Sequence, residues 1–102
     1  MALEMRTTCE RCGEALATDG PARICSFECT FCAGCVNDVL GNVCPNCGGG
    51  FVPRPIRPSI ERRPGVSVAK DPPSDKRVHL KYSLEDVAAH SARLRGIPPQ
   101  ER

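Results

Sequence analysis

The chain has 102 residues and a mass of 11.0 kDa, which leaves room for one compact domain and excludes a large enzyme fold. Aromatic residues make up 4% of the chain, so the side chains that usually dominate a small core are scarce. All eight Cys lie within residues 9–47, which indicates that cross-links or metal ions supply much of the stability. Residues 1–47 carry three basic and six acidic side chains (−3), and residues 48–102 carry eleven basic and six acidic side chains (+5).

The cysteines occur in a chain that starts without the features of an export signal, which are a basic start followed by an apolar run. No apolar stretch approaches the ~20 residues needed to span a bilayer. We therefore expect a cytoplasmic protein. In that reducing compartment structural disulfides are rare, which favours metal binding and leaves a disulfide framework as the alternative.

The spacing of the cysteines groups them into four close pairs. Two Cys separated by two or three residues can both reach one ion from a tight turn, and a closed zinc site takes four thiolates. Gly13 and Gly48 each follow the second Cys of a pair, where a residue able to adopt positive φ lets the turn close around a metal. The pattern predicts two Zn²⁺ ions per chain, with the ligands Cys9, Cys12, Cys25, Cys29, Cys32, Cys35, Cys44 and Cys47.

Short elements are expected within this Cys-rich segment. Residues 22–26 and 30–31 predict a hairpin, and residues 36–40 predict a helix because their apolar side chains recur at i, i+3 and i+4. Gly41 would end the helix. We expect a small core between the metal sites, made of Ile24, Phe27, Phe31, Val39, Leu40 and Val43. Because zinc contributes an apparent ~10–16 kcal/mol to such folds, the metal-free chain should be unfolded.

The order of the four pairs resembles the treble-clef cross-brace of RING-type domains over residues 9–47. The resemblance implies a small, metal-dominated α+β fold in which alternate pairs share an ion. Cys9, Cys12, Cys32 and Cys35 would bind one ion, and Cys25, Cys29, Cys44 and Cys47 the other. The spacing itself also allows a sequential arrangement, with the first four Cys on one ion and the last four on the other.

A ubiquitin-ligase surface is not expected in spite of this resemblance. Glu10 and Arg11 stand where RING ligases usually show an apolar residue, and the chain has no Trp. Gly48 follows the eighth Cys, where ligases carry a basic residue. The fold resemblance therefore does not carry the activity.

A closer resemblance comes from residues 22–32 together with residues 44–49. They resemble an uncharacterised family of small bacterial Cys-rich proteins, catalogued as a domain of unknown function. The resemblance covers about residues 3–60, and residues 81–98 resemble the tail of longer members. It implies a bacterial origin and supports metal binding, but it implies no activity.

Catalytic chemistry is not expected, because two sets of four thiolates leave no open coordination position. The two His lie far along the chain, and we expect His79 to be an exposed strand residue and His90 an exposed helix residue. An iron–sulfur or redox role is an alternative, since Cys29, Cys32, Cys35 and Cys44-Pro45 partly match a ferredoxin run. The gap before Cys44 is eight residues, however, whereas the ferredoxin run has three.

The chain divides into three expected segments: a two-zinc Cys-rich domain at 1–50, a Pro/Arg-rich linker at 51–76, and a short strand plus amphipathic helix at 77–102. Three Pro should keep residues 51–58 extended, and residues 61–74 should form a flexible linker. Residues 78–82 predict a strand or an extended docking segment. Ser83 predicts a helix N-cap, and the helix should carry one apolar stripe, made of Leu84, Val87, Ala88, Ser91 and Leu94.

Such a short helix needs a surface to pack on, which is either the Cys-rich domain or another protein. Nucleic acid is the alternative partner, because Arg54, Arg57, Arg62 and Arg63 could touch phosphates. Eight thiolates and two Zn²⁺ ions would make the Cys-rich domain strongly acidic, which disfavours that reading. Together these features predict a non-enzymatic zinc-binding module that acts as a protein-interaction adaptor or regulator.

Overall fold

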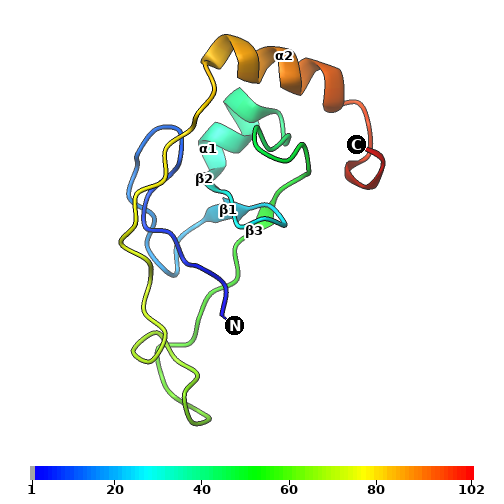
Figure 1. The fold of residues 1–102 in the computed structure, drawn as a ribbon. Coiled ribbons are helices and arrows are strands. Elements are labelled where there is room, and N and C mark those ends of the chain that lie inside the picture. Colours follow the sequence, from blue (N-terminus) through cyan, green and yellow to red (C-terminus); the bar gives the residue numbers. More distant parts are fainter. Residues whose placement is uncertain (1) are drawn as a thin grey trace.

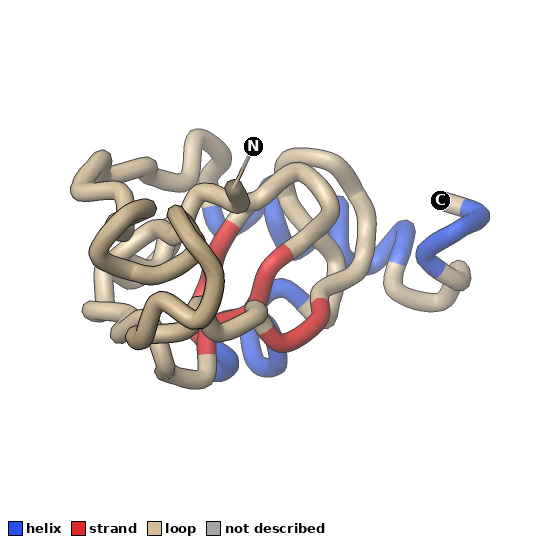
Figure 2. The backbone as a smooth tube through the Cα atoms, turned by 90° about the horizontal axis from the view of Figure 1, so that it is seen from below, coloured by secondary structure: helices blue, strands red, loops and turns tan. Residues whose placement is uncertain are grey.

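A three-stranded antiparallel sheet lies at the centre of the computed structural model, which describes residues 2–102. The molecule is a small α+β fold with the strand order β2-β1-β3, and it measures 45 × 27 × 19 Å (Figure 1). Most of the chain is loop, as the tube view shows (Figure 2). The elements in chain order are β1 (Ala22–Ile24), β2 (Thr30–Cys32), α1 (Ala33–Cys35), η1 (Val36–Leu40), β3 (Val52–Pro53), α2 (Leu84–Leu94) and η2 (Pro99–Glu101).

Strands β1 and β2 form the expected hairpin, in which Arg23 pairs with Phe31. The expectation that Phe27 belongs to the core was wrong, because its side chain is 72% exposed. Phe27 lies in the loop between the strands, midway between the buried side chains of Cys25 and Cys29. The loop turns these two sulfur atoms inward, and that leaves the residue between them outside.

The helical segment after Cys35 forms as predicted and continues directly from the short α1. Cys32 caps α1, since its sulfur accepts a hydrogen bond from the backbone N–H of Cys35. Gly41 adopts the left-handed conformation at φ 59° and ends η1, which is the usual role of Gly at a helix C-terminus.

The core is centred on Phe31 and Leu40, both fully buried, and includes Ile24 and Val43 as predicted. Val39 is partly buried against it. Phe51 joins this core, although its sequence position among Pro residues suggested only an extended linker. The linker is extended, but its first residues belong to the sheet, because β3 pairs with β1.

Arg54 corrects a second expectation, since its side chain is not free to touch phosphate. Its side chain is buried, and its guanidinium donates hydrogen bonds to the backbone oxygens of Arg6 and Ala17 at 2.7 and 3.1 Å. Arg57 likewise donates to the oxygens of Leu3 and Asp71, at 2.6 Å each. Both guanidinium groups therefore tie the chain after β3 to other backbone segments.

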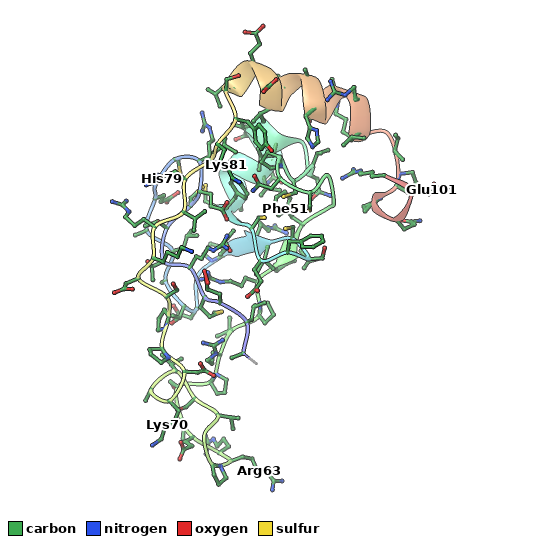
Figure 3. The ribbon with its side chains drawn as sticks, in the orientation of Figure 1. Phe51, Arg63, Lys70, His79, Lys81 and Glu101 are labelled. Atoms are coloured by element: carbon green, nitrogen blue, oxygen red, sulfur yellow. The ribbon has the colours of Figure 1, made fainter. Side chains whose placement is uncertain are left out.

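Residues 58–73 form a loop that extends away from the sheet, with Arg63 and Lys70 at its far end (Figure 3). The loop is closed at its base by the hydrogen bond from the N–H of Val68 to the oxygen of Pro58. The chain then returns along the Cys-rich domain, where the N–H of Leu80 bonds to the oxygen of Glu10 at 2.7 Å. Residues 78–82 thus form an extended docking segment and do not form a strand.

Helix α2 begins after Ser83, whose hydroxyl accepts a hydrogen bond from the N–H of Asp86, as expected of an N-cap. The helix packs on η1, with Val87 and Ser91 buried (Figure 1). Leu84 at the start of the predicted stripe is 54% exposed, so only part of that stripe is covered.

Within residues 2–102, none of the helices has the length and apolar character needed to cross a bilayer.

Candidate metal centre

The first sulfur cluster gathers two Cys pairs that are far apart in sequence. The sulfur atoms of Cys9, Cys12, Cys32 and Cys35 all lie within 4.8 Å of one another. A tetrahedral ion with four sulfurs at about 2.3 Å places those sulfurs about 3.8 Å apart. The Cys12 and Cys32 sulfurs are 3.8 Å apart, so the cluster has the size that such an ion requires.

Local backbone structure positions each member of this cluster. Cys9 and Cys12 lie in a tight turn that closes with a hydrogen bond from the N–H of Gly13 to the oxygen of Cys9. Gly13 has φ 74°, the positive value that its sequence position suggested. Cys32 ends β2 and Cys35 ends α1, so the strand-to-helix junction delivers the other two sulfurs.

The second sulfur cluster brings Cys25, Cys44 and Cys47 within 4.8 Å of one another. Cys44 and Cys47 lie in a turn of the same kind, with a 2.8 Å hydrogen bond from the N–H of Gly48 to the oxygen of Cys44. Gly48 has φ 81°. Cys25 comes from the loop after β1, and its sulfur accepts a hydrogen bond from the N–H of Phe27 at 3.3 Å.

Cys29 lies beside the second cluster and outside its tight group. Its sulfur accepts a hydrogen bond from the side-chain amide of Asn46, in the turn of Cys44 and Cys47, at 3.4 Å. The structure therefore places seven of the eight predicted ligands in two groups and joins the eighth to the second group through Asn46. These groups combine the first pair with the third and the second with the fourth, so they do not match the sequential arrangement.

The thiols in and beside the second cluster differ in pKa because they lie close to one another. The neighbouring Cys25 thiol lowers the pKa of Cys29 to about 2, and the proximity of Cys29 raises the pKa of Cys25 to about 11. The proximity of the Cys25 and Cys29 side chains also raises the pKa of Cys44. Metal binding requires thiolates, so a cation that binds these four sulfurs would displace the protons that the thiols carry without it.

In the first cluster, burial raises the pKa of the Cys9 thiol, but nearby backbone N–H groups outweigh burial. Hydrogen bonds from the N–H groups of Cys12, Cys32 and Arg11 leave the Cys9 pKa below its ordinary value. Backbone N–H donors aimed at sulfur favour the thiolate, which is the form that binds metal.

Two residues that contact the sulfurs were not predicted from the sequence. Arg11 donates a hydrogen bond to the sulfur of Cys35 at 3.6 Å, and Asn46 donates to the sulfur of Cys29. Both occupy the same position, directly before the second Cys of a Cys-x₂-Cys turn. In each turn this side chain bonds to the second Cys of another pair. The sequence signal that could have identified both residues is a polar side chain at the same position of the two turns.

Neither His belongs to a sulfur cluster. His79 is exposed on the segment that runs along the Cys-rich domain (Figure 3). The expectation that His90 is exposed was wrong, because its ring is partly buried and its Nε2 lies 3.1 Å from the oxygen of Cys44. A carbonyl oxygen can only accept, so Nε2 carries the proton in this contact.

These features define a small Cys-rich α+β protein with two thiol clusters that could hold metal ions. The chain belongs to the family described as "Protein of unknown function (DUF1272)", whose model matches residues 2–57. This match confirms the resemblance found in the sequence. An uncharacterised protein of Rhizobium meliloti (strain 1021) is 57% identical over 58 residues, which cover 56% of this chain and 69% of that protein. No solved structure matches the chain at a significant level.

Proposed function

We propose that residues 9–47 form a treble-clef, RING-like cross-brace that binds two Zn²⁺ ions, and that the protein is a non-enzymatic adaptor or regulator of other proteins in the bacterial cytoplasm. The observation that carries the metal proposal is the interleaving of the sulfur clusters. Cys9 and Cys12 meet Cys32 and Cys35, whereas Cys25 meets Cys44 and Cys47. Alternating pairs of this kind are what a cross-brace requires.

Cys29 completes the second site in this proposal. The support is the correspondence between the two Cys-x₂-Cys turns. Arg11 of the first turn donates to Cys35, a ligand of the first site, and Asn46 at the matching position of the second turn donates to Cys29. By this correspondence Cys29 holds in the second site the place that Cys35 holds in the first.

Structural zinc suits these donors better than a catalytic metal. Four thiolates in a closed tetrahedral set are typical of structural zinc, which contributes folding free energy and leaves no position for substrate. Among residues 2–102, neither group includes a His or carboxylate ligand, which are the usual partners of zinc in hydrolytic sites. The role we infer for the ions is therefore structural.

An adaptor role is supported by the exposed apolar side chains on the surface. Phe27, Val52 and Ile56 are each at least 60% exposed, and such side chains are suited to contacts with another protein. Arg54 and Arg57 are used within the fold, which weakens the nucleic-acid alternative. Weak or absent binding of a DNA or RNA oligonucleotide at low salt is the result we expect, and tight binding with a steep salt dependence would favour the alternative.

Native mass spectrometry combined with elemental analysis tests the metal proposal. We expect two Zn per chain, a colourless protein, and loss of ordered structure on chelation. Cys9→Ser and Cys29→Ser should each reduce the content to one Zn, whereas Ser26→Ala, a change between two ligands of the second site, should leave two. A protein with disulfides in place of bound metal, or a brown protein containing iron, would refute the proposal.

A further inference from the structure

The C-terminal segment, residues 83–102, lies across the loop that carries half of the second sulfur cluster (Figure 1). Ser91 on α2 donates a hydrogen bond to the oxygen of Leu40 at 2.8 Å, and the neighbouring His90 donates to the oxygen of Cys44. Arg102 donates to the oxygens of Asn42 and Gly48, at 3.1 Å each. Four backbone carbonyls of residues 40–48 are thus bonded by side chains of one segment.

Close packing accompanies these bonds. An added Cβ at Gly41 would lie 2.7 Å from the hydroxyl oxygen of Ser91, and one at Gly48 would lie 3.3 Å from the Cδ1 of Leu94. Cys44 is completely buried, while Cys47 next to it in the turn is exposed. Helix α2 therefore covers the backbone of this turn and leaves one of its sulfurs accessible from outside.

The two sulfur clusters differ in this cover. The first Cys-x₂-Cys turn receives a backbone hydrogen bond from the segment 74–102, and this bond runs from the N–H of Leu80 to the oxygen of Glu10. The second turn and the loop before it receive the side chains of His90, Ser91 and Arg102. The family match ends at residue 57, so it includes all eight Cys and none of this covering segment.

We propose that residues 83–102 form a strap that retains the metal ion of the second site, with His90, Ser91 and Arg102 as positioning residues. The inference rests on the proposed binding of two ions. For the ion to leave, Cys44 and Cys47 must separate from Cys25, and the loop that carries them must open. The strap opposes opening because its bonds to residues 40–48 break at the same time. Because part of this opposition is lost with the strap, its loss should speed release of this ion about tenfold or more.

Paired proline variants of the full-length protein test the strap. Ala89→Pro places Pro in the interior of α2, where it removes a helical hydrogen bond and clashes with the preceding turn. Leu84→Pro places Pro at the first helical position, where the missing N–H is harmless and the extended backbone of Ser83 accepts a following Pro. The two proteins differ in whether α2 can form, and both retain all eight Cys.

Zinc release into an excess of a colorimetric chelator gives the rates, and alkylation with peptide mapping identifies the cysteines freed first. In Ala89→Pro we expect one of the two ions to leave about tenfold faster, with Cys44 and Cys47 alkylated first. The slower release of the other ion and the behaviour of Leu84→Pro should match the parent protein. Ser91→Ala, which keeps the helix, should give a smaller acceleration of the same ion.

Each other outcome has a distinct meaning. If the parent protein binds fewer than two zinc ions, the proposed function fails. If two ions bind and neither Ala89→Pro nor Ser91→Ala changes a release rate, the strap proposal is wrong. Equal acceleration of both ions, or first alkylation at Cys9 and Cys12, would also overturn it, because the effect would then be a general loss of stability.

Discussion

Phe31 and Phe51 pack edge to face, with ring centroids 5.5 Å apart and an interplanar angle of 82°. Phe31 lies on β2 between two Cys-rich segments, and Phe51 directly precedes β3. Edge-to-face geometry suits the quadrupoles of two aromatic rings, and it adds to the gain from burial. This pair links the core between the sulfur clusters to the edge strand contributed by the Pro-rich segment.

Phe51→Ala should therefore destabilise the metal-loaded protein by about 3 kcal/mol, since it removes a buried ring and leaves a cavity. Phe27→Ala is the matched control and should change stability by less than about 0.5 kcal/mol, because Phe27 is exposed. Urea denaturation in the presence of bound metal measures both. Equal losses for the two variants would show that Phe51 does not lie in the core.

Glu10 is a buried acceptor, and its carboxylate binds the N–H of Thr30 at 2.6 Å and the guanidinium of Arg6 at 2.5 Å. Glu10→Leu should cost about 1–3 kcal/mol, because it leaves the buried N–H of Thr30 without a partner. Glu10→Gln should recover part of this loss, since the amide oxygen can still accept from Thr30. The same change to Leu at the exposed Glu14 serves as the control, and the urea midpoints of the four proteins decide the order.

Arg54→Lys tests whether the forked guanidinium matters or only its charge. Lys cannot reach the oxygens of both Arg6 and Ala17 with parallel donors, so we expect a loss of about 1–2 kcal/mol. The exposed Arg62 should tolerate the same change. A Lys variant as stable as the parent would mean that position 54 needs only a positive charge.

Gly41→Ala should loosen the contact between η1 and α2. Gly41 has positive φ, which an Ala side chain opposes at a cost of about 1 kcal/mol, and its added Cβ would also collide with Ser91. Gly65 has φ 82° with nothing within 4 Å of an added Cβ, so Gly65→Ala carries the backbone cost alone. We expect the Gly41 variant to be the less stable of the two and to show greater protease cleavage within α2. Equal stabilities would indicate that α2 does not contact Gly41 this closely.

Local signals accounted for the parts of the fold that depend on near neighbours. The hairpin at residues 22–32, the helix end at Gly41 and the N-cap at Ser83 were predicted because each depends on side chains a few residues apart. The positive φ of Gly13 and Gly48 followed in the same way from the geometry of a Cys-x₂-Cys turn.

Residues whose environment comes from distant segments were predicted poorly. Phe27 and Phe51 are the same amino acid, yet the first is exposed and the second is buried, because burial depends on which remote segment covers each ring. Arg54 was expected to be available for phosphate, but the folded chain places the backbone oxygens of Arg6 and Ala17 at its guanidinium. No periodicity in the sequence encodes these contacts.

By itself the sequence determined that eight thiols in four close pairs dominate this small protein, since the spacing within a pair sets what one turn can bind. The RING resemblance implied that Cys9 and Cys12 meet Cys32 and Cys35, but the spacing also allowed the sequential arrangement, and the tertiary structure decided between them. Only the tertiary structure showed that His90 and Ser91 lie on the loop of the second cluster. Pairing between distant segments depends on how the whole chain closes around its core, and that is a property of packing, which residue spacing does not specify.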